Sequence, residues 1–366
     1  MQPRLYNIPS SRSPAARALV PLLIGALAFL APACKKAATP TAASHPPTVT
    51  INVGFLPVST SLPNHVAVSE GLMAGRGVEV NFKRFANANL MLAALLSGEI
   101  QATSVLADEP ILGAASRGTH GFEIYLQEML SDDRTFDAIV VRVDSPIKSL
   151  ADLRGRTVAA FPGTQLKTFL KIILRDAGVD PGEVKVIELP PPNMLPSLES
   201  KSIDAAFVLE PTISIGSARG VTRILVPSPI VKYIGGGKPI CAASFLIATA
   251  WADAHPGAAD AFVRAVHEAV KRIEDNYPAC AKLYPKFTPI PAELAERVVV
   301  TRFTGNDAPD LKGLSRELSI LTEAGAMGER AVDLKSLVYR WRTGAAGVSR
   351  RPMMEAQRLN EAGAPE

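Results

Sequence analysis

The sequence predicts an α/β fold of two similar lobes, with the second lobe inserted within the first. Strands and helices alternate through most of the chain, an order typical of a sheet covered by helices on both faces. One pattern also occurs twice: residues 98–106 lead to Glu109-Pro110, and residues 201–209 lead to Glu210-Pro211. Beyond the N-terminal segment about 300 residues remain, which exceeds one hydrophobic core and suits two domains.

Hydrophobic periodicity indicates the elements of the first lobe in turn. Apolar residues at every second position favour a strand, and a spacing of three to four favours a helix. The predicted elements are a strand at 48–55, a turn-rich loop at 57–63, a helix at 64–73, a strand at 78–85, a helix at 89–97, a strand at 100–105, a helix at 110–116 and a strand at 136–143.

The same order restarts in the second lobe. A strand at 157–161 ends in the turn Pro162-Gly163-Thr164-Gln165 and a helix at 166–177 follows, so backbone N–H groups and small polar side chains converge at this turn. A strand at 184–189, a helix at 194–200, a strand at 205–209 and a helix ending at 219 come next. A strand at 242–249 returns the chain, and mainly helical sequence follows from 258 to 341. We therefore expect the first lobe at 48–144 and 242–342, the second lobe at 145–241, and a flexible tail at 343–366.

Residues 1–33 have the organisation of a signal peptide. Arg4, Arg12 and Arg17 precede an uncharged run at 18–33, which ends in small residues just before Cys34. Small residues before a cysteine are typical of lipoproteins, and the polar segment 34–47 would then be the linker after a lipidated Cys34. The same residues also fit a plain A-x-A cleavage site, which predicts ordinary secretion. In both cases the mature protein is expected on the periplasmic or cell-surface side.

The remaining cysteines leave two alternatives open. If Cys34 carries a lipid, Cys241 and Cys280 remain as a pair, and an exported compartment permits a disulfide between them. Two free buried thiols are the other possibility, and neither cysteine belongs to a CxxC motif.

Charge and motifs argue against several function classes. Removing residues 1–33 removes three arginines and no acid, so the formal charge falls from +4 to +1, which is not the charge of a nucleic-acid binder. The segment Gly235-Gly-Gly-Lys238-Pro239 has Pro where a phosphate-binding P-loop requires Ser or Thr, which argues against ATP hydrolysis. His267-Glu268 is followed by Lys271 where a zinc HExxH motif needs its second histidine. We expect neither cofactor nor metal.

Several stretches together resemble a known family. These are VGFLPVSTSLPNHVAVSEGLMAGRGVEVNFKRFANANLMLAALLSGEIQAT, IKSLADLRGRTVA with its PGT turn, DAGVDPGEVKVIELPPPNMLPSLESKSIDAAFVLEP, and FLIATAWADAHPGAADAFVRAV. They are similar to the substrate-binding proteins of the nitrate, sulfonate, taurine and thiamine-precursor group, the NMT1-like type II periplasmic binding proteins of ABC importers. The resemblance covers roughly residues 48–283.

This resemblance implies a Venus-flytrap receptor with two Rossmann-like lobes, which closes by a hinge on a small molecule and delivers it to ABC permease subunits without chemical turnover. Placement at strand ends, with motif agreement for Ser59, Thr60, Thr164 and Gln165, suggests ligand contacts. Tyr233 is added because, from its glycine-rich loop, it could stack on a ring of the ligand. The candidate contacts are Ser59, Thr60, Asn87, Asp108 and Glu109 in the first lobe, and Thr164, Gln165, Asn193, Glu210 and Tyr233 in the second. Each candidate also has a purely structural alternative. The hydroxyl groups of the Ser and Thr residues could serve in turns or as helix caps, and Glu109 and Glu210 could stabilise the helices that they begin. Tyr233 could simply pack in the core.

The substrate class stays open at this point. Nitrate and sulfonates require N–H, hydroxyl and Arg donors, whereas acidic residues at the rim of a cleft suit an amine or an aminopyrimidine. Pyrimidine-precursor and menaquinone-pathway enzymes of similar fold are alternative functions, but the first use a cysteine-rich motif that this chain lacks, and an export signal argues against the second. A ligand-sensing partner of a membrane receptor is a third possibility.

Overall fold

Two separate β-sheets organise the chain. A computed structural model describes residues 48–343, so the predicted signal peptide, Cys34 with its linker, and the tail at 344–366 lie outside the described residues. The first sheet has seven strands in the order β12-β5-β11-β3-β1-β2, and β4 pairs with β11. Its strands are β1 (Val49–Phe55), β2 (Val78–Arg84), β3 (Ala102–Thr103), β4 (Leu106–Ala107), β5 (Phe122–Leu130), β11 (Ile240–Ala248) and β12 (Arg302–Gly305).

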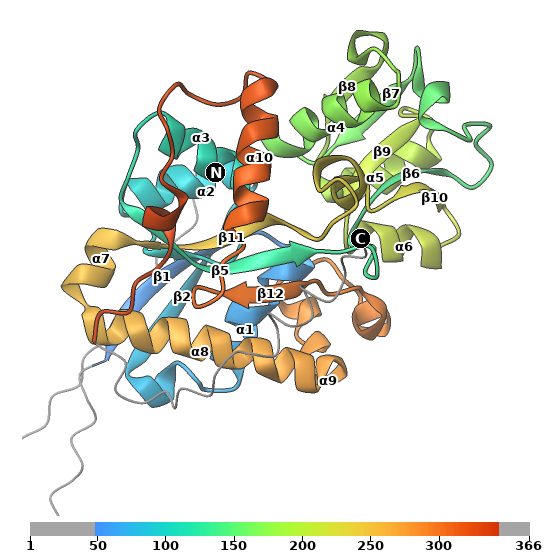
Figure 1. The fold of residues 1–366 in the computed structure, drawn as a ribbon. Coiled ribbons are helices and arrows are strands. Elements are labelled where there is room, and N and C mark those ends of the chain that lie inside the picture. Colours follow the sequence, from blue (N-terminus) through green and yellow to red (C-terminus); the bar gives the residue numbers. More distant parts are fainter. Residues whose placement is uncertain (1–47, 344–366) are drawn as a thin grey trace, which may run out of the picture. The chain divides into compact units, whose positions relative to one another are not determined.

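Helices cover both faces of the first sheet (Figure 1). One face carries α1 (Leu62–Ser69), α8 (Pro256–Asp275) and α9 (Tyr277–Ala281), and the other carries α2 (Ala88–Leu96), α3 (Asp108–Ser116) and α10 (Leu311–Glu323), while α7 (Thr249–Ala254) follows β11. The amphipathic helix α8 buries Phe262, Val263 and Val266 in this core, because apolar side chains three to four apart share one face of a helix.

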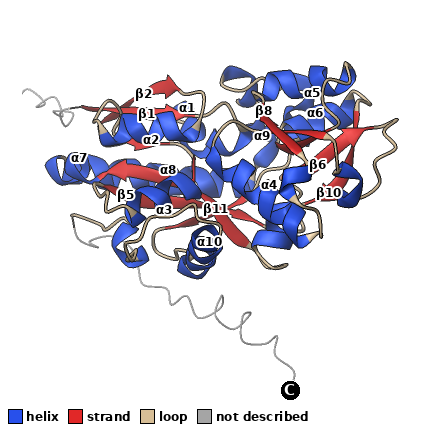
Figure 2. Cartoon of the chain, turned by 90° about the horizontal axis from the view of Figure 1, so that it is seen from above, coloured by secondary structure: helices blue, strands red, loops and turns tan. Residues whose placement is uncertain are grey.

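The second sheet has five strands in the order β10-β6-β9-β7-β8. Its elements are β6 (Asp137–Arg142), β7 (Thr157–Ala160), β8 (Lys185–Glu188), β9 (Ala205–Leu209) and β10 (Thr222–Pro227), with α4 (Thr164–Asp176), α5 (Pro191–Glu199) and α6 (Thr212–Ala218). Ile139 and Val141 of β6 share a core with α4, whereas Ala138 and Val140 share one with α5 and α6. This alternation follows from the two-residue repeat of a strand. Figure 2 shows α4 on one side of this sheet and α5 and α6 on the other.

The two sheets repeat one arrangement of three strands. In the first, β1 pairs in parallel with β2 and β3, and in the second, β7 pairs in parallel with β8 and β9. The remaining pairings are antiparallel, so both sheets are mixed. The duplicated sequence pattern contains the third strand of each arrangement, which is β3 in the first sheet and β9 in the second. Glu109-Pro110 comes shortly after β3 and β4, and Glu210-Pro211 comes directly after β9.

One expected boundary between the lobes is wrong. The sequence predicts the strand at 136–143 in the first lobe, but β6 pairs with β9 and β10 of the second sheet. The chain therefore passes between the sheets at 131–136 and returns at 228–239. The reason is physical: an apolar strand fits the core of either sheet, and only its pairing partners decide where it lies.

The structure differs from the sequence prediction in three further strands and in the end of one helix. Periodicity predicts neither β5 nor β10. Strand β12 interrupts the region at 258–341, which the sequence predicts to be mainly helical. Helix α1 ends at Ser69 and not at residue 73.

Within residues 48–343, no helix is both long enough and apolar enough to cross a membrane.

Candidate functional site

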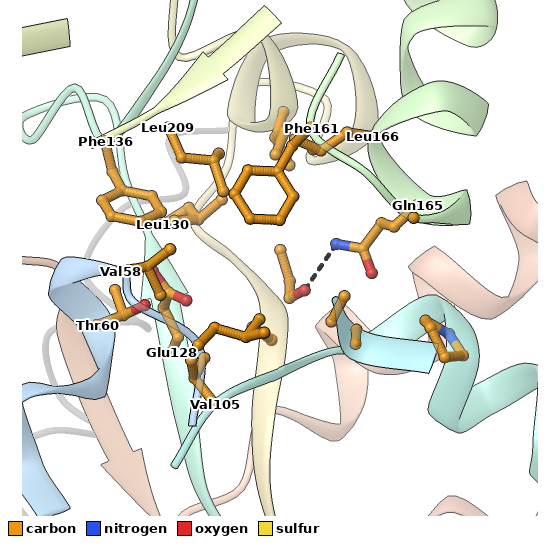
Figure 3. A pocket seen from close by; sticks show the side chains of 18 of the residues that line it. Val58, Thr60, Val105, Glu128, Leu130, Phe136, Phe161, Gln165, Leu166 and Leu209 are labelled. Atoms are coloured by element: carbon orange, nitrogen blue, oxygen red, sulfur yellow. Dashed lines mark hydrogen bonds between the residues drawn. The ribbon is translucent and has the colours of Figure 1, made fainter. Parts of the chain in front are cut away.

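A cavity of about 90 Å³ lies between elements of the two sheets, and we call it the central cavity (Figure 3). Residues on the first-sheet side are Leu56, Val58, Thr60, Ala88, Val105, Ala107, Pro110, Glu128, Leu130, Ala242 and Ala243. Residues on the second-sheet side are Phe136, Phe161, Pro162, Gly163, Thr164, Gln165, Leu166, Leu209 and Ile230. Contributions from both sheets make this cavity the place where a small molecule would touch both lobes.

The wall of the central cavity is mainly apolar. Thr60, Glu128, Thr164 and Gln165 supply its polar side chains. Among these lining residues, all within the described range, none is Lys, Arg or His. Such a wall suits a mostly apolar molecule that is oriented by a few hydrogen bonds.

Glu128 is the one carboxyl group of the wall. It lies on β5, opposite Ala243 of β11 and Phe303 of β12, and its side chain is 3% exposed. Its Oε1 atom has no hydrogen-bond partner within the described part of the chain. Burial raises the pKa of Glu128 to about 8, and the charges of Asp108 and Asp137 add to the rise while Thr301 opposes it. Figure 3 shows Glu128 and Thr60 on one side of the cavity and Gln165 on the other.

Sequence reasoning missed Glu128 because it missed the strand that carries it. The stretch FEIYLQEML of β5 contains three polar side chains that are buried, Glu123, Gln127 and Glu128. Acids and amides inside an apolar run are the signal that was available, since charged side chains are seldom buried without a partner or a function.

Gln165 connects the two lobes at the edge of the cavity. Its Oε1 atom accepts a hydrogen bond from the backbone N–H of Glu109 at 2.8 Å, and its Nε2 atom donates to the carbonyl oxygen of Ala242 at 2.8 Å. The neighbouring Thr164 hydroxyl donates to the Glu109 carboxylate. Burial raises the pKa of Glu109, and Thr164 and Arg117 counteract part of that rise. Three of the predicted site residues therefore contact one another across the lobes.

Glu210 lines a second cavity, of about 140 Å³, which shares Val58, Phe161 and Leu209 with the central one. Its carboxylate accepts hydrogen bonds from the backbone N–H of Ser214 at 3.0 Å and from the Ser214 hydroxyl at 2.7 Å. Burial raises the pKa of Glu210 to about 7. These bonds tie the carboxylate to α6, which is the helix-stabilising role that the sequence left open.

Three predicted residues lie near the first-sheet side of the central cavity but outside its lining. Ser59 is fully buried, and its hydroxyl has no partner among the described residues. Asn87 caps α2 by accepting a hydrogen bond from the Leu90 N–H at 3.0 Å. Asp108 is fully buried and accepts a hydrogen bond from the Cys241 thiol at 3.0 Å. Burial raises the pKa of Asp108 to about 6.

The other two predicted residues belong to the second lobe and line neither of the two cavities. Asn193 is exposed on α5. Tyr233 is half-buried in the short π-helix Ile230–Ile234, where it packs against the core beside α4. The Lys232 ammonium lies 5.1 Å from the centre of the Tyr233 ring. Tyr233 therefore packs against the core, which is the alternative role given for it above.

The possible disulfide is wrong, because Cys241 and Cys280 are both free and buried. They belong to separate elements: Cys241 of β11 faces Asp108, and the Cys280 thiol of α9 lies 3.7 Å from the carbonyl oxygen of Arg272. Burial and the Asp108 charge raise the pKa of Cys241, so its thiol stays protonated. Within the described residues, no group of three or more His, Cys, Asp and Glu side chains is arranged to hold a metal ion.

Comparison with known proteins points to one family. Residues 44–283 match the model of the NMT1-like family. The taurine-binding periplasmic protein of Escherichia coli K12 is 24% identical over 220 residues, which are 60% of this chain and 65% of that relative. The match therefore spans a little under two thirds of that relative.

Solved structures share the fold. The periplasmic aliphatic sulphonate binding protein SsuA of Escherichia coli superposes with a TM-score of 0.63 at 20% identity, over 81% of this chain and 98% of that one. The alkanesulfonate-binding protein SsuA of Xanthomonas axonopodis pv. citri, bound to MOPS, superposes with a TM-score of 0.63 at 19% identity, over 81% of this chain and 100% of that one. The predicted two-lobed periplasmic binding protein fold is thus confirmed.

Proposed function

Because the chain belongs to the NMT1-like family, we propose that it is an extracytoplasmic solute-binding protein of an ABC importer. It captures a small molecule in the central cavity, closes its lobes on it, and presents it to the permease subunits. The observation that carries this proposal is the position of the cavity, whose wall combines residues of both sheets. A ligand that touches both lobes stabilises the closed state over the open one.

The connections between the sheets support a hinge. The chain passes between them twice, at 131–136 and at 228–239, and these segments would bend while each sheet stays intact. Closure about a few such residues is the usual motion of two-lobed binding proteins. The lobes that move would be residues 48–130 with 240–342, and residues 137–227.

The proposal includes export and a lipid anchor. The basic, apolar and small-residue segments of residues 1–33 support export, and the position of Cys34 directly after them supports lipidation. The periplasmic location in the name of the E. coli relative agrees with export. The mature protein would then be held at the membrane by its lipid while the two lobes remain outside the bilayer.

A ligand screen tests the function. Protein lacking residues 1–33 is heated with nitrate, taurine, alkanesulfonates, alkylamines or aminopyrimidines, and its melting temperature is measured. A solute present at 100 times its Kd stabilises the folded state by about 2.7 kcal/mol, which raises the melting temperature by on the order of 5 °C. The same solute should reduce the radius of gyration in small-angle scattering and be recovered unchanged.

Two variants locate the bound solute. Ala107→Leu adds three carbon atoms to a residue that lines the central cavity, so it should abolish the stabilisation. Ala93→Leu makes the same change on the exposed face of α2 and should bind as the unaltered protein does. Conversion of the solute by the purified protein would instead indicate an enzyme of the same fold, and binding without any cognate permease would indicate a sensor.

A further inference from the structure

The charge of the central cavity narrows the ligand class, and this inference rests on the proposed solute-binding function. Glu128 is the one carboxyl group that lines the cavity, and the lining contains no Lys, Arg or His. Its Oε1 atom is buried, and the neighbouring Thr301 hydroxyl can donate to the carboxyl group. One neutral hydroxyl satisfies only part of the hydrogen-bonding capacity of a carboxyl group, so a donor group on a ligand in the cavity would gain a further hydrogen bond there.

A small oxyanion fits this cavity poorly. The N-terminus of α4 is the obvious anion site, because helix N-termini present free N–H groups and a positive dipole end. Glu109 already places its carboxylate there, where it accepts a hydrogen bond from the Thr164 hydroxyl. A bound sulfonate or nitrate at the start of α4 would therefore lie close to the Glu109 carboxylate. Glu128 would share the apolar wall with it, and the lining has no Lys, Arg or His to balance its charge.

We propose that the central cavity binds a small apolar amine, whose nitrogen donates a hydrogen bond to Glu128 and whose hydrocarbon body packs against the apolar wall. Phe136 and Phe161 from the second-sheet side and Val58 and Val105 from the first-sheet side supply that wall. The cavity of about 90 Å³ limits the body to a short branched chain or a small ring, since an apolar cavity of about 150 Å³ holds benzene.

Matched probes test the charge preference without knowledge of the natural ligand. Isobutylamine, isobutanol and 2-methylpropane-1-sulfonate share a short branched body, and cyclopropylmethylamine, cyclopropylmethanol and cyclopropylmethanesulfonate share a small ring. Their Kd values for the protein lacking residues 1–33 are measured by calorimetry. In at least one set, the amine should bind at least about tenfold more tightly than the sulfonate, because a hydrogen bond to a charged partner is worth about ten- to a hundredfold in affinity.

Variants of Glu128 assign this preference to the carboxyl group. A bound ammonium group favours the ionised form of Glu128. Glu128→Gln, which cannot ionise, should therefore weaken amine binding by at least about tenfold and change alcohol binding by less than about threefold. Glu128→Asp, which draws the carboxyl back by one methylene, is the second variant and should weaken amine binding if Glu128→Gln does not fold. Far-ultraviolet circular dichroism and the melting temperature check the fold of both.

Three results would overturn the inference: a sulfonate that binds more tightly than its matched amine, an amine affinity that Glu128→Gln and Glu128→Asp leave unchanged, or no binding in either set. A sulfonate whose binding Ala107→Leu abolishes would refute the amine assignment and leave the proposed function standing. If no solute of the wider screen binds or compacts the protein, the proposed function fails as well.

Discussion

At the scale of single residues, buried carboxyl groups give the protein a distinct response to pH. Burial raises the pKa of Glu128 from its ordinary value of 4.5 to about 8, and that of Asp137 to about 7. A carboxyl whose pKa is raised by folding stabilises the folded state while it is protonated. Its contribution is complete below its ordinary pKa and is lost as the pH rises through its folded value.

The first prediction follows for Glu128. Between pH 7 and pH 9 the unfolded chain keeps this group ionised, while the folded protein must release its proton, so the free energy of unfolding should fall by about 1.4 kcal/mol on its account. Glu128→Gln should lose less stability over this range in urea titrations, by about that amount. Glu79→Gln, on an exposed residue of β2, should behave as the unaltered protein. Equal slopes for all three proteins would contradict the protonated Glu128.

The second prediction separates two roles of Glu210. If its carboxylate selects the ligand, Glu210→Gln weakens ligand binding by about 1.5–3 kcal/mol while the melting temperature barely changes. If it only stabilises α6 through Ser214, affinity is unchanged and stability falls by about 0.5–1.5 kcal/mol. Ser214→Ala is the matched control, because it removes the hydroxyl partner and leaves the carboxylate. An unchanged affinity in Glu210→Gln removes Glu210 from the binding site.

At the scale of elements, the beginnings of α3 and α4 meet across the lobes. Gln165 at the start of α4 bonds to Glu109 at the start of α3 and to Ala242 of β11. All three groups move apart if the lobes open about the two connecting segments. Gln165 therefore stabilises the closed arrangement whether or not it also touches the ligand.

The third prediction tests this contact. Gln165→Ala removes two hydrogen bonds between the lobes, each worth about 0.5–1.5 kcal/mol, so it should favour the open state and weaken ligand binding by about five- to a hundredfold. Small-angle scattering of the ligand-free variant should show a larger radius of gyration. Gln101→Ala is a suitable control, since Gln101 also makes two hydrogen bonds, with Asn52 and Gly98, but both lie within the first lobe. If both variants have the same radius and affinity, the contact does not govern closure.

At the scale of the whole molecule, the proposed export segment and lipid anchor would decide where the two lobes work. The proposed lipid on Cys34 would keep the protein beside its permease, which raises its effective concentration there. None of the contacts described for residues 48–343 depends on that lipid, so anchoring and binding should be separable.

The fourth prediction is that Cys34→Ser releases the protein from the membrane fraction of cells while its ligand affinity stays unchanged. Membrane and soluble fractions are compared by immunoblotting. Cys280→Ser, a change at a free buried thiol, should leave the protein in the membrane fraction. If the unaltered protein is itself soluble, cleavage at the A-x-A site explains the N-terminus better than lipidation.

The sequence by itself determined what depends on neighbouring residues. The strand and helix on either side of the turn Pro162-Gly163-Thr164-Gln165 follow from local periodicity, and β7 and α4 lie there. The structure brings Thr164 and Gln165 of this turn to the cavity wall. The duplicated pattern ending at Glu109 and Glu210 likewise predicted two related arrangements of strands, which the pairing of both sheets confirms.

Only the tertiary structure decided what depends on distant partners. An apolar strand such as β6 satisfies either core, so its place in the second sheet is set by pairing with β9 and β10. Glu128 becomes a cavity residue because β5, β11 and the segment after β1 that contains Val58 and Thr60 meet around it, which no local pattern encodes. Asn193 follows a strand as expected and Tyr233 lies before the glycine-rich segment, yet neither residue lines either cavity. Long-range packing decides which side chains are buried and which of them find hydrogen-bond partners. It therefore decides which chemical groups a ligand in this cavity would meet.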